Sequence, residues 1–142
     1  MSLRRWSALG LVAAAVSAGI AYAAFTATTV KVTLKEFSVA ASPKAAKRGK
    51  VTFSVHNGGK LAHSFIVVRT NLAPGKLPVK NKAVNLTKLK VIGRIASIKA
   101  GKTSSLSAKL AAGKYVLFCN LKGHYQAGQY KGFQVLSILP VK

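Results

Sequence analysis

Alternating apolar and polar side chains mark several short segments of this chain. Residues 51–56 alternate strictly, with Val or Phe at the odd positions, and residues 105–110 alternate Ser or Lys with Leu or Ala. This period of two predicts strands with one buried face. His56 falls on the polar side of its strand, so we assign it a structural role. Further strands are predicted at 30–39, 63–70, 91–98, 115–120 and 130–138.

Turn signals separate these segments. Residues 57–60 read Asn-Gly-Gly-Lys and residues 111–114 read Ala-Ala-Gly-Lys, and both sequences favour turns. Residues 71–90 contain two prolines and little periodicity, which predicts a long connection with one helical turn near 86–89. In the 30–39 strand we expect Val32, Leu34 and Phe37 to face a core. Many short strands separated by turns predict an all-β fold, an antiparallel β-sandwich.

The first 23 residues have the features of an export signal. Arg4 and Arg5 precede an apolar run at 6–20, and Ala21-Tyr22-Ala23 is a small-x-small cleavage site. We therefore predict a signal peptide at 1–23 and a single domain at 24–142, exported to the periplasm or the cell exterior. The alternative is an uncleaved membrane anchor, because residues 6–25 are about long enough to span a bilayer.

The charge balance excludes several classes of function. The 142 residues include 23 Lys and Arg but one acidic residue, Glu36, for a formal net charge of +22. One carboxylate cannot supply paired acid–base chemistry, and a Ser-His-Asp triad lacks its acid, so we predict that the chain is not an enzyme. The basic residues are dispersed rather than gathered into a nucleic-acid-binding tract. They predict an acidic redox protein or an anionic envelope surface as partner, and we interpret Glu36 as a surface ion-pair partner.

The strongest chemical signal is the segment from Cys119 to Gln129. Cys119 is the only cysteine, so it cannot form an internal disulfide in an oxidising compartment. Four residues separate it from His124, and four more separate His124 from Gln129. This one loop offers a thiolate, an imidazole and a further donor, and His63 offers a second imidazole from a different strand. Together they are the ligand supply of a mononuclear copper site. Zinc accepts the same donors and remains an alternative at this point.

Three segments carry a family resemblance. Residues 51–59, residues 63–68 and residues 113–133, which include Cys119 and His124, resemble the corresponding parts of cupredoxins, the plastocyanin/azurin-type blue-copper proteins with a Greek-key sandwich. The resemblance implies that His63, Cys119 and His124 are equatorial copper ligands. Family members usually have an axial methionine where this chain has Gln129, and stellacyanin-type cupredoxins use glutamine in that role. An amide oxygen is a harder donor than a thioether and favours Cu(II).

These observations leave three functional hypotheses. The first is an exported one-electron carrier with one copper ion, and the second is a copper storage or delivery module without redox duty. The third is a metal-free basic domain that binds the envelope by charge. Ser64 and Asn120 adjoin predicted ligands and are expected to hydrogen-bond to them or to the thiolate.

Overall fold

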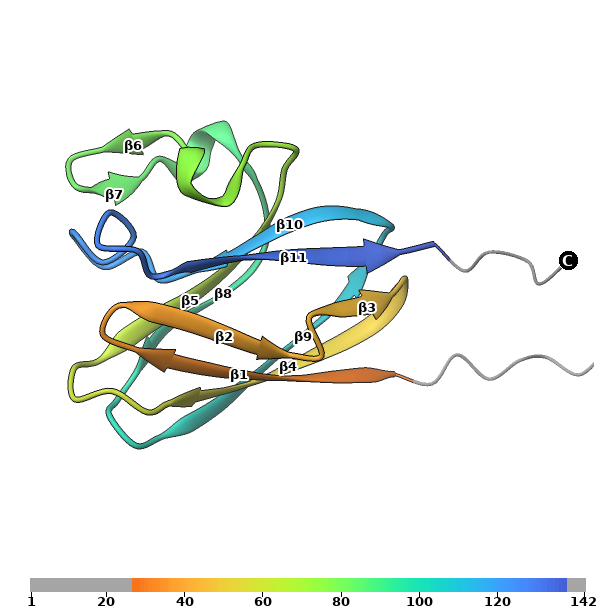
Figure 1. The fold of residues 1–142 in the computed structure, drawn as a ribbon, viewed down its shortest axis with the longest axis horizontal. Helices are drawn as coiled ribbons and strands as arrows, with labels where there is room; N and C mark the ends of the chain where they lie inside the picture. Colours follow the sequence, from red (N-terminus) through yellow and green to blue (C-terminus); the bar gives the residue numbers. More distant parts are fainter. Residues whose placement is uncertain (1–26, 138–142) are drawn as a thin grey trace, which may run out of the picture.

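The computed structural model describes residues 27–137 as two packed β-sheets (Figure 1). The predicted signal peptide at 1–23 lies outside the described residues. The four-stranded sheet contains, in spatial order, β2 (Ser38–Ser42), β1 (Thr28–Lys35), β4 (Gly49–Asn57) and β9 (Thr103–Leu110). The five-stranded sheet contains β3 (Ala45–Lys47), β11 (Tyr130–Leu136), β10 (Gly113–Phe118), β5 (His63–Arg69) and β8 (Lys90–Ile98).

The predicted all-β sandwich is confirmed, with one refinement of strand direction. Most neighbouring strands are antiparallel, but β1 pairs in parallel with β4, and β3 pairs in parallel with β11. The parallel register sets Leu34 opposite Asn57. It thereby brings the end of β1 beside the turn that follows β4.

The predicted strand at 30–39 is two strands joined by a tight turn. β1 ends at Lys35 and β2 begins at Ser38, so Glu36 and Phe37 form the turn. Val32 and Leu34 are buried as expected, but the assignment of Phe37 to the core was wrong, because this side chain is 41% exposed. The alternation that buries residues 30, 32 and 34 ends where the chain reverses.

The main core lies between the two sheets and contains three packed aromatic rings. Phe53 of β4 contacts Phe65 of β5 and Phe133 of β11, each with ring centroids 5.6 Å apart. These side chains occupy the inward face of each strand, as the period-two pattern requires. Burial of the apolar face is therefore what fixes the register of the sandwich.

Residues 71–90 cover the outer face of the five-stranded sheet and create a second, smaller core. This connection contains two 3₁₀ turns and a short hairpin: η1 (Pro74–Lys76), β6 (Val79–Lys80), β7 (Ala83–Val84) and η2 (Leu86–Lys88). The helical turn predicted near 86–89 is confirmed by η2. The second core explains why β5 is apolar on both faces, since Ile66 and Val68 pack under the connection while Phe65 and Val67 face the main core.

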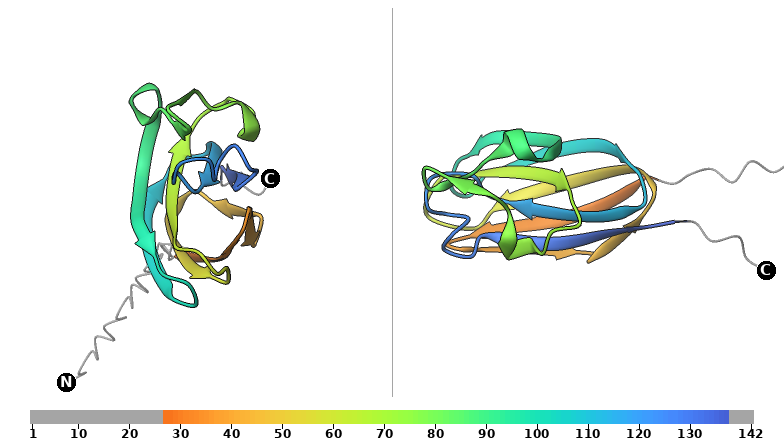
Figure 2. Two further views of the ribbon diagram at one scale, coloured as in Figure 1. Left: turned by 90° about the vertical axis from the view of Figure 1, so that its left-hand side faces the viewer. Right: turned by 90° about the horizontal axis from the view of Figure 1, so that it is seen from above.

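The strands run along the long axis of the molecule, so the sandwich has two ends (Figures 1 and 2). One end, at the left in Figure 1, contains the turn at 36–37, the loop at 58–62 and the loop at 119–129. We name it the ligand end. At the opposite end, β1 and β4 begin and β9 and β11 finish. Between residues 27 and 137, no helix has the length and apolar character needed to cross a membrane.

Candidate metal centre

Three of the four predicted ligands meet at the ligand end. His63 is the first residue of β5, Cys119 follows β10, and His124 lies in the loop between β10 and β11. The two histidine Nδ1 atoms are 3.2 Å apart, and the Cys119 Sγ lies 4.0 Å from that of His63 and 3.6 Å from that of His124. His63 and Cys119 are fully buried, whereas His124 is half-buried.

The separations of these donors fit one metal ion. Three donors that surround an ion at about 2.1 Å in a trigonal plane are about 3.6 Å apart. The observed separations of 3.2–4.0 Å bracket that value. One thiolate and two imidazoles are also the donor set that suits copper. The cluster of His63, Cys119 and His124 therefore supports a single copper ion.

Gln129 is the fourth predicted ligand, and its amide is oriented toward the cluster. The Nε2 group donates a hydrogen bond to the backbone carbonyl of Lys35 at 2.9 Å. This contact directs Oε1 to the opposite side, where it lies 3.2 Å from Nδ1 of His124. The side chain is fully buried and does not face solvent. Its amide oxygen is available as a fourth donor.

The loop that carries Cys119, His124 and Gln129 is closed by its own backbone. Cys119 N–H donates to the carbonyl of Gln129, and Gln129 N–H donates to the carbonyl of His124, both at 3.1 Å. Gly123 and Gly128 adopt positive φ angles of 82° and 109°, which glycine accommodates without a Cβ clash. These bonds hold the three side chains at one place although nine residues of chain separate the first from the last.

Ser64 supports the Cys119 sulfur from β5. Its backbone N–H lies 3.3 Å and its Oγ 3.5 Å from Sγ. The Oγ also accepts a hydrogen bond from the backbone N–H of Asn120 at 2.8 Å, so its proton is free to point at the sulfur. Asn120 in turn pairs through its side chain with both backbone groups of Val84. The expectation for Ser64 is confirmed, whereas Asn120 acts through its backbone N–H on Ser64 and ties the loop to β7.

Glu36, the only carboxylate in the sequence, lies directly behind His63. Its Oε1 is 2.8 Å from His63 Nε2, and the carboxylate also accepts backbone N–H groups from Lys60 and Leu61 at 2.8–3.0 Å. Glu36 is exposed and forms an ion pair, as interpreted from the sequence, but its partner is the buried ring of His63 rather than another surface side chain. Because Nε2–H donates to Glu36, the neutral imidazole presents the lone pair of Nδ1 to the cluster.

The environment of Glu36 keeps its carboxylate ionised. Hydrogen bonds from the backbone N–H groups of Leu61 and Lys60, and from the side chain of His63, lower the pKa of Glu36 from 4.5 to about 2. They outweigh the opposing effect of desolvation, since the side chain retains 25% of its exposure. The carboxylate is therefore a fixed negative charge at neutral pH.

The turn between β1 and β2 touches three of the four candidate ligands through consecutive residues. The carbonyl of Lys35 holds Gln129, the carboxylate of Glu36 holds His63, and the ring of Phe37 packs edge-on against the His124 ring with centroids 5.0 Å apart. The only sequence signal for a role of this turn was its isolated acidic residue, Glu36. That the turn lies beside the candidate ligands follows only from the long-range pairing of β1 with β4.

Asn57 fixes the loop that supplies the N–H groups bound by Glu36. This fully buried side chain donates to the carbonyls of Leu61 and Ile98, both at 2.8 Å, and accepts from Gly59 N–H at 2.9 Å. The chain of contacts therefore runs from Asn57 through the loop to Glu36 and on to His63. His56, the third histidine, projects from the polar face as predicted and contacts Thr103 Oγ1 at 3.0 Å.

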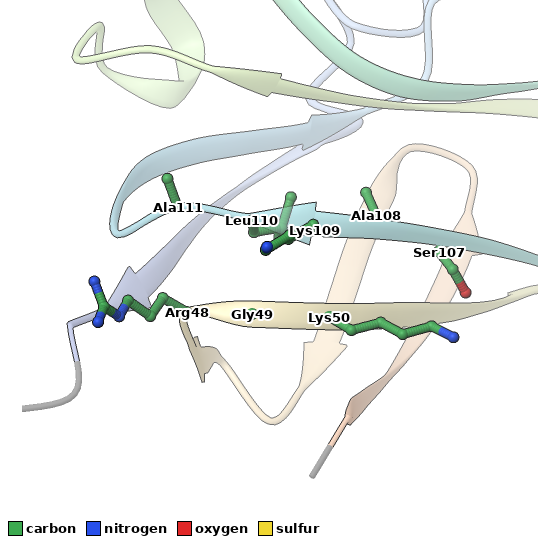
Figure 3. Close-up of a pocket in the computed structure, with 8 residues that line it drawn as sticks. All are labelled: Arg48, Gly49, Lys50, Ser107, Ala108, Lys109, Leu110 and Ala111. Carbon is green, nitrogen blue, oxygen red and sulfur yellow. The ribbon is translucent and has the colours of Figure 1, made fainter. Parts of the chain in front are cut away.

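A broad hollow lies away from the candidate ligands, at the opposite end of the sandwich. It has a volume of about 940 Å³ and is formed by the beginning of β4 and the end of β9 (Figure 3). Its lining includes the cationic residues Arg48, Lys50 and Lys109 and the apolar residues Ala108 and Leu110. Lys50 and Lys109 are directly opposite each other in the strand register, so two like charges share this surface.

Known structures share the fold. No family model matches the sequence, and no curated protein matches it. The structure is similar to an azurin from Methylomonas sp. strain J, with 17% identity, a TM-score of 0.57 and coverage of 77% of this chain and 98% of that chain. Rusticyanin from Thiobacillus ferrooxidans is 18% identical with a TM-score of 0.56, and the match covers 77% of this chain and 78% of that chain. Auracyanin A from Chloroflexus aurantiacus, a "blue" copper protein, is 16% identical with a TM-score of 0.53, and the match covers 78% of this chain and 99% of that chain.

These similarities define the class of fold. Azurin, rusticyanin and auracyanin are cupredoxins, and the chain has the cupredoxin fold. The resemblance noted in the sequence is thereby confirmed at the level of fold, with a His-Cys-His cluster at the expected place.

Proposed function

We propose that this protein is an exported copper protein that acts as a one-electron carrier, with His63, Cys119 and His124 as equatorial ligands and Gln129 as the axial ligand. The observation that carries the proposal is the cluster of two imidazole nitrogens and one sulfur within 4.8 Å of one another. A copper ion bound by such donors exchanges one electron reversibly between Cu(I) and Cu(II). Auracyanin A, which has a similar fold, is a "blue" copper protein, and a carrier role agrees with the prediction from charge that the chain is not an enzyme.

The residues around the cluster favour electron transfer because hydrogen bonds within the protein hold the candidate ligands in place. Glu36 orients His63, Ser64 supports the sulfur of Cys119, and Lys35 orients Gln129. A site whose donors do not move between the two oxidation states needs little reorganisation when an electron arrives or leaves. Phe37 is exposed beside the half-buried His124, so His124 is the ligand best placed to pass an electron to a partner.

The donor arrangement favours copper over zinc. Structural zinc sites have four strong donors in a tetrahedron. Here three strong donors lie around one point, and the fourth is a neutral amide oxygen. A trigonal His₂Cys set with one weak axial donor is the arrangement expected for a redox copper ion.

The basic surface supports a role for charge in partner choice. Within residues 27–137, the one ion pair is between Glu36 and His63, so no lysine or arginine of this region has a carboxylate partner. Such a surface attracts an acidic redox protein or an anionic envelope, and the attraction weakens with salt. Export to the periplasm or cell exterior rests on the predicted signal at 1–23.

The first test is titration of the purified protein with Cu(II), followed by visible absorption and electron paramagnetic resonance. We expect an intense thiolate-to-copper band at one equivalent that mild reductant bleaches and oxidant restores. Cys119→Ala should abolish the band. A band without reversible cycling and fast self-exchange would favour storage or delivery, and a folded, reduced protein without any band would contradict a copper role.

Gln129→Met tests the axial assignment within the same experiment. A thioether favours Cu(I) relative to an amide oxygen, so the variant should have a higher reduction potential than the wild type. An unchanged potential would contradict axial ligation by Gln129.

A further inference from the structure

We infer that Glu36 is the positioning residue of His63 and that its negative charge biases the copper site toward the oxidised ion. This inference rests on the proposed function, because it concerns the same four candidate ligands. It adds a residue outside that set, located in the turn between β1 and β2 of the other sheet, and gives the only acidic side chain of the sequence a defined role.

The first argument is the fixed geometry of the carboxylate. Oε1 accepts from His63 Nε2 and from Leu61 N–H, each at 2.8 Å, while Lys60 N–H donates to both oxygens. Two backbone groups thus hold the carboxylate independently of the histidine. The His63 ring is fully buried, so it cannot rotate freely away from this partner. The contact therefore selects both the tautomer and the ring orientation of His63.

The second argument comes from Gly59. A Cβ atom at residue 59 would overlap the carboxylate group of Glu36. Only glycine leaves room for this carboxylate next to the loop that anchors it. The sequence of the 57–61 loop is therefore matched to the position of Glu36.

The third argument is electrostatic. A carboxylate that accepts the proton of one imidazole nitrogen makes the other nitrogen a stronger donor. The negative charge also lies one imidazole ring away from the donor cluster, on the Nε2 side of His63. Both effects stabilise Cu(II), which carries the larger positive charge, more than Cu(I). Because the sequence contains no other Glu or Asp, no second side chain can compensate for the loss of this charge.

The decisive variant is Glu36→Gln, which removes the charge but keeps the length of the side chain. We expect the Cu(II)/Cu(I) ratio at a fixed applied potential to fall at least tenfold, which is a rise of about 59 mV for a one-electron couple. Competition titrations should show a larger loss of affinity for Cu(II) than for Cu(I).

Thr29→Lys is the matched control, because it raises the net charge by the same amount. Thr29 is exposed near the start of β1. It lies seven residues from Glu36, which is about 23 Å along an extended strand. This distance exceeds the Debye length of about 10 Å at 0.1 M salt. We expect less than a twofold change in the same ratio. An equal shift in both variants, or no shift in Glu36→Gln, would overturn the inference. Equal losses of affinity for Cu(II) and Cu(I) in Glu36→Gln would show that Glu36 has only a structural role, and this result would also overturn the inference.

Two further variants separate contact from charge and cover a failure of Glu36→Gln to fold. Glu36→Asp retains the charge with a shorter reach, and Gly59→Ala retains Glu36 but displaces its carboxylate. Both should raise the potential by less than Glu36→Gln does. Potentials equal to that of the wild type in both variants would contradict a role for the contact with His63.

The metal-free protein provides a readout that does not depend on copper. In nitrogen-15 NMR spectra, the wild type should show a downfield His63 Nε2–H proton protected from exchange, and Glu36→Gln should lose that protection. Absence of the protected proton in the wild type would overturn the positioning role even if copper binds. A protected proton in a protein that shows no copper band would contradict the proposed function and the redox part of this inference. It would still support the contact between Glu36 and His63.

Discussion

The two ends of the sandwich are stabilised in different ways. Among the described residues, all four buried polar side chains belong to the ligand end or to the strand ends that form it: Asn57, His63, Ser64 and Gln129. Each has a hydrogen-bond partner in the protein. At the opposite end, Leu110 is buried beneath Lys50 and Lys109, which face each other without an anion.

This contrast indicates that the ligand end restricts the sequence and the conformation more than the opposite end does. Buried polar groups are costly unless every one is paired, so a connected network selects one arrangement of the chain. Apolar burial with charges left in solvent tolerates many sequences. We therefore expect substitutions at the ligand end to have large effects on stability and on the site, and substitutions at the opposite end to have small ones.

The largest effect on stability is expected for Asn57→Ala. The substitution removes three hydrogen bonds from a fully buried side chain. At about 1 kcal/mol net for each bond, the free energy of unfolding should fall by about 3 kcal/mol. Urea unfolding of the copper-free protein measures this change.

Thr52→Ala is the control for this prediction. Its hydroxyl bonds to Ser107 on an exposed face of the four-stranded sheet, where substitutions usually change stability by about 0.5 kcal/mol or less. Losses of similar size in the two variants would contradict the proposed difference between a buried network and an exposed pair.

The next effect is expected in acid and depends on Glu36. The folded-state pKa of about 2 lies below the ordinary value of 4.5, so the ionised carboxylate stabilises the folded state above about pH 4.5. This contribution is lost as the pH falls through the folded-state value toward 2. Unfolding of the copper-free protein, measured at intervals from pH 5 to pH 2, should show a fall in stability across this window.

Glu36→Gln should remove that part of the pH dependence, because no other acidic side chain exists in the sequence. Its stability should be lower than that of the wild type at pH 5 and should change less between pH 5 and pH 2. Parallel curves for the two proteins would show that Glu36 does not hold a depressed pKa in the folded state.

The same contrast explains how far the sequence could predict the structure. The strands at 51–56 and 105–110 were predictable because alternation reports burial directly, and β4 and β9 confirm them. The cluster of Cys119 and His124 was predictable because both residues lie on one short loop. These features depend on local spacing, which a single sequence displays.

The supporting residues depend on pairing between distant segments. Glu36 reaches His63 because β1 pairs in parallel with β4, a contact that no local pattern reveals. The strand predicted at 30–39 also concealed the turn that directs Phe37 to His124. The available signal for Glu36 was that it is the one acidic side chain in a sequence with 23 cationic side chains. This rarity was more informative about its role than its position in the predicted strand at 30–39.

The smallest effect is expected at the opposite end, for Lys109→Glu. Lys50 and Lys109 are directly opposed on β4 and β9 and both are exposed. Like charges in this position repel, whereas an opposite-charge pair contributes about 0.2–1 kcal/mol. The variant should therefore be more stable than the wild type by up to about 1 kcal/mol, with less of a gain at high salt.

Lys109→Gln separates relief of repulsion from the new attraction, and it should give a smaller gain than Lys109→Glu. Neither variant should change the copper absorption band, because this surface lies at the other end of the sandwich from the candidate ligands. Loss of stability in Lys109→Glu, or an altered band, would show that the two ends are coupled. The division between a hydrogen-bonded ligand end and a permissive opposite end would then have to be abandoned, because a charge on β9 would reach the network around Glu36 and His63.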